Sequence, residues 1–125
     1  MNKKVIVVGA LIFIIFAIIL FFMMKSDKIV LNTNGGVPYK WEYEIDDESI
    51  VKFYDEKAVE VNPGFDGGAI KMNYYFKGLK KGKTIITFKY VNFVDGRIDK
   101  TVKYEVKVNY FLRVSIREIE RMNEY

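Results

Sequence analysis

The side chains in this chain that could do chemistry are carboxylates and lysines, because the sequence contains no histidine and no cysteine. Asp46, Asp47 and Glu48 form one acidic run, and Asp55 and Glu56 form another. Such groups can transfer protons or bind Ca²⁺, but their spacing matches no calcium-binding loop and fits exposed acidic turns. Histidine, the commonest general base and metal ligand, is missing. We therefore expect no catalytic residue, no metal site, no cofactor and no small-molecule substrate.

A basic cluster surrounds a glycine-containing turn at residues 78–82. Its members are Lys77, Lys80, Lys81 and Lys83. The cluster could contact anionic lipid or a cell-wall polymer, or it could be a solvated turn that prevents edge-to-edge strand pairing, and we favour the second interpretation. Lys83-Thr84 follows Gly82, but the segment after it is an expected strand and not the helix that a phosphate-binding loop requires, which excludes such a loop. Without Lys3 and Lys4, the rest of the chain carries 18 of the 20 basic residues and all 16 acidic ones, a near balance that does not indicate nucleic-acid binding.

An apolar segment without any charge occupies residues 5–24. As a helix, 20 residues span about 30 Å, the thickness of a bilayer's hydrocarbon core. Lys3 and Lys4 precede the segment, so the positive-inside rule places residues 1–4 in the cytoplasm and the C-terminal domain outside it. A cleaved signal peptide is the alternative, but bulky residues at 20–24 disfavour cleavage. We expect a signal-anchor helix in the cell membrane, followed by a short connector at 25–28.

The rest of the chain alternates between apolar and polar residues in short runs. Between residues 39 and 45, Tyr39, Trp41, Tyr43 and Ile45 share one face, which predicts a half-buried strand with Trp41 in the core. Asp95-Gly96 is a favoured hairpin turn. Further strands are expected at 29–31, 50–54, 57–61, 69–77, 84–90 and 100–108. In the extension at 109–125, three apolar residues spaced as on one helical face would suit a helix, but we favour a strand followed by a frayed end. This pattern predicts an all-β domain, an immunoglobulin-like β-sandwich preceded by one transmembrane helix.

Around the first predicted loop, Asn34, Tyr39 and Trp41 resemble part of a known motif. The motif is Asn-Pro-Thr-Thr-Gly-(Tyr/Phe)-x-Trp, the first functional loop of chagasin-type inhibitors of papain-like cysteine proteases. Gly67 and Gly68 resemble the paired glycines of that family's second loop. The resemblance covers residues 29–108 and implies an immunoglobulin-like sandwich whose three loops enter the protease cleft.

The resemblance is strongest at framework positions and weakest at the loop tips. Gly35, Gly36, Val37 and Pro38 replace Pro-Thr-Thr-Gly. In the third loop, where the family carries Arg-Pro-Trp, this chain has its own three residues, Asn92, Phe93 and Val94.

Two functions remain open from the sequence. The resemblance implies a reversible inhibitor, anchored in the lipid bilayer through 5–24, whose partner is a papain-like cysteine protease. The contact residues would be Asn34, Gly35, Gly36, Val37, Gly67, Gly68, Asn92, Phe93 and Val94. The alternative is a non-inhibitory extracytoplasmic binding or structural module, because a sandwich scaffold does not by itself imply its relatives' function.

Overall fold

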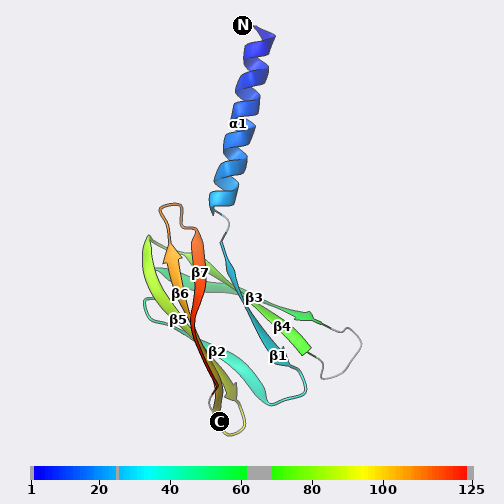
Figure 1. Ribbon diagram of the computed structural model, residues 1–125, viewed down its shortest axis with the longest axis vertical. Coiled ribbons are helices and arrows are strands. Elements are labelled where there is room, and N and C mark those ends of the chain that lie inside the picture. The colour runs from blue at the N-terminus through cyan, green and yellow to red at the C-terminus, as the bar shows by residue number, and fades with distance from the viewer. Residues whose placement is uncertain (1, 25, 62–68, 124–125) are drawn as a thin grey trace.

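The computed structural model describes residues 2–24, 26–61 and 69–123. One helix, α1 (Lys3–Met24), precedes seven strands (Figure 1). The strands are β1 (Lys28–Asn34), β2 (Tyr39–Ile45), β3 (Val51–Glu60), β4 (Ala69–Gly78), β5 (Gly82–Asn92), β6 (Ile98–Val108) and β7 (Val114–Asn123). The bounds of β2 match the expected strand at 39–45, where strict alternation of side chains gives the clearest signal.

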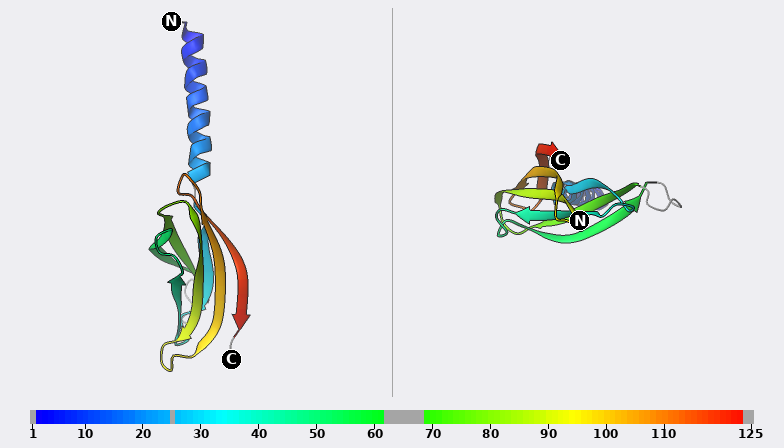
Figure 2. Two further views of the ribbon diagram at one scale, coloured as in Figure 1. Left: turned by 90° about the vertical axis from the view of Figure 1, so that its left-hand side faces the viewer. Right: turned by 90° about the horizontal axis from the view of Figure 1, so that it is seen from below.

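The strands form two antiparallel sheets that pack face to face (Figure 2). One sheet has the order β1-β4-β3 and the other β2-β5-β6-β7. The predicted immunoglobulin-like β-sandwich preceded by one apolar helix is thus confirmed. Consecutive strands β2 and β3 belong to different sheets, so the chain crosses between layers and joins both around one core.

The core is built from the inward faces of both sheets and centres on Phe88. This side chain is fully buried and contacts the rings of Tyr74, Phe76 and Tyr104. Trp41, expected in the core, is only half-buried and packs against its margin, where its ring meets that of Phe88 edge-on. An indole can keep its N–H near polar groups when it sits at such a margin.

One feature of the sheets differs from the expected strands, and another confirms an expected strand. The separate strands predicted at 50–54 and 57–61 are one strand, β3, whose register against β4 shifts between Phe53 and Asp55. A β-bulge of this kind lets a strand continue past a break in its alternation. The expected strand in the extension forms as β7, which pairs with β6 along its length and buries Val114 completely.

α1 is apolar, and its described side chains are largely exposed in the isolated chain. It is long and apolar enough to cross a membrane, and a signal sequence would have the same character. After the helix, the backbone N–H of Asp27 donates to Val114 O at 2.8 Å, and Ser26 Oγ accepts from Val114 N at 3.0 Å. The segment after α1 is therefore fixed to the first residues of β7, next to the β6–β7 turn.

Candidate functional site

Two loops that the resemblance singles out meet at the end of the sandwich farthest from α1 (Figure 1). They are the β1–β2 loop (residues 35–38) and the β5–β6 loop (residues 93–97). Tyr39 pairs with Asn92 in the sheet register, and the backbone N–H of Phe93 donates to Pro38 O at 2.9 Å. Because β2 and β5 are neighbours, the two loops emerge side by side and share this hydrogen bond.

The β1–β2 loop is a tight turn organised by Asn34. Asn34 closes β1, and its side-chain Oδ1 accepts a hydrogen bond from Gly36 N at 2.9 Å. Its backbone carbonyl also accepts from Val37 N at 3.4 Å. Asparagine commonly stabilises turns through such contacts with the following backbone. The loop therefore presents Gly35, Gly36 and the exposed Val37 outward, while the Asn34 side chain holds the turn.

The β5–β6 loop is organised in the same way by Asn92. Its side chain is buried, and Oδ1 accepts from Val94 N at 2.9 Å and from Asp95 N at 3.3 Å. Gly96 has φ of 78°, a conformation that glycine adopts without steric penalty. With its backbone held, the loop exposes 60% of Phe93 and 77% of Val94. Asn92 thus positions the loop, and Phe93 and Val94 are its exposed apolar residues.

A layer of aromatic rings lies beneath both loops. Tyr39 stacks on Tyr90 with ring centroids 5.0 Å apart, and the Trp41 ring centroid lies 4.7 Å from that of Tyr90. The Trp41 Nε1–H donates to Asn32 O at 3.0 Å, and the hydroxyls of Tyr90 and Thr33 are 3.0 Å apart. These contacts join β1, β2 and β5 immediately below the loops, so the loop bases are fixed before any partner binds.

Gly67 and Gly68, the paired glycines of the second resembling loop, lie outside the described residues. The described residues on either side of that loop are Val61 and Ala69, joined by a hydrogen bond from Val61 N to Ala69 O at 3.1 Å. Ala69 is also the register partner of Asn34. Val61 and Ala69, the described residues that flank this loop, therefore lie next to the start of the β1–β2 loop.

A family model for the chagasin family peptidase inhibitor I42 matches residues 24–108. This is well over half of the chain. The chain belongs to the chagasin family of peptidase inhibitors. Searches of curated proteins and of solved structures gave no match. The expected family is therefore confirmed, and the matched range holds β1 to β6 and both described loops, while β7 lies beyond it.

Several residues beside the two loops were not proposed as site residues from the sequence, although Glu56 was named as part of an acidic run. A groove of about 450 Å³ lies between the β1–β2 loop and the neighbouring strands, and Glu56, Met72 and Tyr74 contribute to its lining together with Phe93. Glu56 lies on β3, and Met72 and Tyr74 lie on β4, so all three belong to the β1-β4-β3 sheet. Only the tertiary fold brings these strands to the loops, so sequence spacing gave no signal for them.

Arg97 is a further residue that sequence reasoning missed. Its Nη2 donates to the Tyr39 hydroxyl at 3.0 Å, and this hydrogen bond raises the pKa of the guanidinium above its ordinary value. Its backbone carbonyl accepts from Asn92 N at 2.8 Å. Arg97 thus links the end of the β5–β6 loop to the first residue of β2. Its position directly after the Asp95-Gly96 turn is the sequence feature that could have identified Arg97 as part of this loop.

The first acidic run has a structural role in this fold. Asp47 Oδ1 accepts from Ser49 N at 3.0 Å and from the Ser49 hydroxyl. These hydrogen bonds lower the pKa of the Asp47 carboxyl. The run lies in the β2–β3 turn, whereas Asp55 and Glu56 belong to β3.

Proposed function

We propose that this chain is a membrane-anchored, reversible inhibitor of papain-like cysteine proteases. Membership of the chagasin family supports peptidase inhibition. The active surface would be the adjoining β1–β2 and β5–β6 loops, with Val37, Phe93 and Val94 as the contact side chains and Gly35 and Gly36 allowing close approach. We extend the proposal to Gly67 and Gly68 from the family resemblance alone.

The observation that carries this proposal is the pair of adjacent loops with exposed apolar tips on an ordered base. The Phe93–Pro38 hydrogen bond and the aromatic layer around Tyr90 hold the loops in place. A surface that is ordered before binding loses little conformational entropy on association. Exposed apolar side chains at its centre are suited to fill a concave cleft. Since the chain has no cysteine, we expect inhibition to be non-covalent.

The anchoring part of the proposal rests on α1. A stretch of 19 residues with spanning character lies near the N-terminus, and its first two residues are Lys3 and Lys4, so it would hold the domain on the extracytoplasmic side. The loops would then face away from the bilayer, because they lie at the opposite end from α1 (Figure 1). Proteases reaching the outer face of the membrane would meet these loops without obstruction.

Two matched substitutions test whether these loops are the inhibitory surface. Val37 is 39% exposed in the β1–β2 loop, and Leu79 is 40% exposed in the β4–β5 turn near α1. Val37→Glu should weaken inhibition of a papain-like protease at least tenfold, because a carboxylate would have to enter the cleft, whereas Leu79→Glu should leave it unchanged. Equal inhibition constants for both variants, each folded by circular dichroism, would refute the assignment of these loops as the inhibitory surface. A folded parent chain without any inhibition would favour the alternative of a non-inhibitory binding module.

A further inference from the structure

The β6–β7 turn exposes three consecutive apolar residues at the end of the sandwich that carries α1. Tyr110 is 80% exposed, Phe111 45% and Leu112 42%. Single exposed apolar residues are common, but three in succession on a turn mark a contact surface. This turn is far from the two loops of the proposed inhibitory site, so peptidase inhibition does not account for it.

The turn is held by side-chain hydrogen bonds, and its conformation is unusual for its sequence. Asn109 Oδ1 accepts from Phe111 N at 3.0 Å and from Arg113 N at 2.8 Å. Leu112 has φ of 62°, the left-handed conformation that leucine seldom adopts and glycine adopts freely. A backbone outlier of this kind can indicate a functional requirement for the side chain it carries. The turn therefore holds a large apolar side chain where glycine would be the easier choice.

The β4–β5 turn lies against the same surface. A Cβ at Gly78 would lie only 2.6 Å from Leu112 O, so the two turns are in backbone contact. The Lys81 ammonium is 3.8 Å from the centre of the Tyr110 ring. Leu79, the residue after Gly78 in the β4–β5 turn, is 40% exposed. The two turns thus form one surface of apolar side chains bordered by lysines, a composition typical of segments at the membrane interface.

Chain connectivity places this surface close to where α1 ends. Ser26 is two residues beyond Met24, the last residue of α1, and an extended chain spans at most about 7 Å over two residues. Ser26 Oγ accepts a hydrogen bond from the backbone N–H of Val114, and Val114 is two residues beyond Leu112. Figure 1 shows the β6–β7 turn reaching the level of the lower end of α1. If α1 spans a bilayer, this turn must lie at the bilayer's surface.

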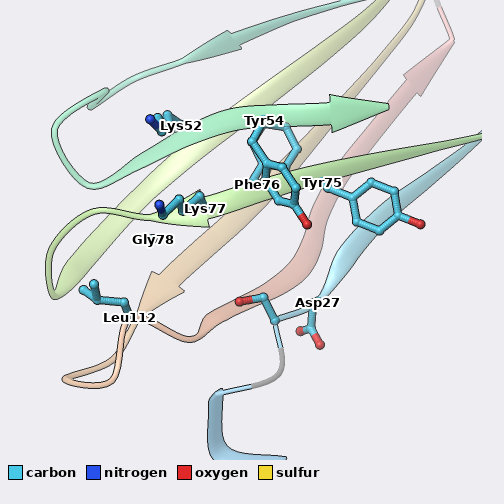
Figure 3. A pocket seen from close by; sticks show the side chains of 9 residues that line it. Asp27, Lys52, Tyr54, Tyr75, Phe76, Lys77, Gly78 and Leu112 are labelled. Atoms are coloured by element: carbon cyan, nitrogen blue, oxygen red, sulfur yellow. The ribbon is translucent and has the colours of Figure 1, made fainter. Parts of the chain in front are cut away.

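Two lysines stand beside the turn in an arrangement that suits an anion. A hollow of about 690 Å³ is lined by Leu112, Asp27, Lys52 and Lys77 among others (Figure 3). Lys52 and Lys77 are direct cross-strand partners on β3 and β4. In the described part of the chain neither ammonium has an ion-pair partner, and like charges directly opposite repel. The Asp27 carboxylate in the hollow accepts from Ile116 N at 2.9 Å instead.

We propose that this end of the domain is a second binding surface, which docks on the headgroup region of an anionic bilayer. Tyr110, Phe111 and Leu112 insert among the lipids, and Lys52 and Lys77 face the lipid phosphates. The acidic β2–β3 turn adjoins the β4–β5 turn, because Leu79 N donates to Ile50 O at 2.7 Å, and its carboxylates oppose the attraction of the lysines. The inference rests on the anchoring part of the proposed function, and its consequence is a domain held upright with the inhibitory loops directed away from the membrane.

The test uses the full chain in lipid nanodiscs and exploits the absence of cysteine. Single variants Phe111→Cys, Val94→Cys and Phe13→Cys each receive a nitroxide label. Power-saturation electron paramagnetic resonance then reports whether each label is reached by oxygen, which concentrates in lipid, or by a water-soluble nickel complex. The Phe13 label reports on α1 itself, and the Val94 label reports on the distal loop.

In discs containing anionic lipid, the 111 label should be shielded from nickel and the 94 label should be accessible to it. Lysine near an anionic surface favours the bound state by roughly fivefold per residue. Lys52→Glu with Lys77→Glu should therefore expose the 111 label to nickel, while the matched pair Lys40→Glu with Lys71→Glu should not. Labels at 111 and 94 equally accessible to nickel, with the 13 label immersed, would overturn the docking proposal alone. If the nitroxide at position 13 were instead accessible to nickel, α1 would not span the bilayer and the anchor would be refuted. Neither outcome bears on inhibition, which is assayed separately.

Discussion

Replacing Phe93 by alanine should weaken inhibition strongly while leaving the fold intact. Phe93 lies at the tip of the β5–β6 loop, and its backbone N–H holds the β1–β2 loop through Pro38 O. The substitution keeps this backbone hydrogen bond and removes only the ring. Any loss of inhibition then reports on the contact between the ring and the protease.

The size of the effect follows from the exposed area of the ring. Phe93 is 60% exposed, which for a phenylalanine surface of roughly 200 Å² leaves about 120 Å² available to a partner. At about 25 cal/mol per Å², complete burial would contribute about 3 kcal/mol. Each 1.4 kcal/mol is about tenfold in affinity. We expect the inhibition constant to rise between about tenfold for half burial and about a hundredfold for complete burial.

The assay is steady-state hydrolysis of a peptide substrate by a papain-like protease, titrated with the full chain. Phe111→Ala is the matched control, since Phe111 is 45% exposed in a turn at the opposite end. Both variants should unfold within about 0.5 kcal/mol of the parent chain, as is usual for exposed positions. A change below twofold for Phe93→Ala, or the same loss for Phe111→Ala, would refute the assignment of the contact surface.

Three further predictions concern the loop base, the last strand and alkaline pH. Asn34→Ala removes the acceptor of Gly36 N, so the free energy of unfolding should fall by about 1 kcal/mol and inhibition should weaken. An unchanged free energy of unfolding in chemical denaturation, together with an unchanged inhibition constant, would contradict this. Val114→Ala should cost about 2 kcal/mol in the same assay, because the side chain is fully buried, whereas Ile119→Ala on the exposed part of β7 should cost little. Burial, with a contribution from Glu118, raises the pKa of Tyr104 from 10.0 to about 12. The folded state therefore favours the neutral phenol. The contribution of Tyr104 to stability is fully present below about pH 10 and is lost as pH rises towards 12. Tyr104→Phe should therefore flatten this part of the curve of melting temperature against pH.

Local side-chain patterns were enough to predict the architecture. Strict alternation at 39–45 gave the bounds of β2, and the apolar run at 5–24 gave α1 almost to the residue. Asp95-Gly96 gave the β5–β6 turn, in which Gly96 has positive φ. These signals depend on neighbouring residues alone, which is why they can be read without knowing the fold.

The parts that were missed depend on contacts between distant residues. The bulge between Phe53 and Asp55 is defined by the register against β4, which the local pattern at 50–61 does not contain. The strand in the extension was expected, although its residues also suit one helical face, and only its pairing with β6 could not be predicted. Arg97 meets Tyr39 only because β2 and β5 are neighbours.

The candidate site shows the same division. The positions of Asn34 and Asn92 were found from the family resemblance, but their side chains hold the turns, and in Asn92 the side chain is buried. The exposed tips that follow them, Val37, Phe93 and Val94, were named in the same segments. Sequence therefore located the loops, while the structure separated the residues that shape them from those that a partner can contact.

The central claim is inhibition of papain-like cysteine proteases, and its most direct test is a panel of these enzymes titrated with the full chain in nanodiscs. Folding is checked by circular dichroism on the same sample. We predict reversible inhibition of at least one member at submicromolar concentration, competitive with the peptide substrate. A folded chain that leaves every member fully active at high micromolar concentration would contradict the claim.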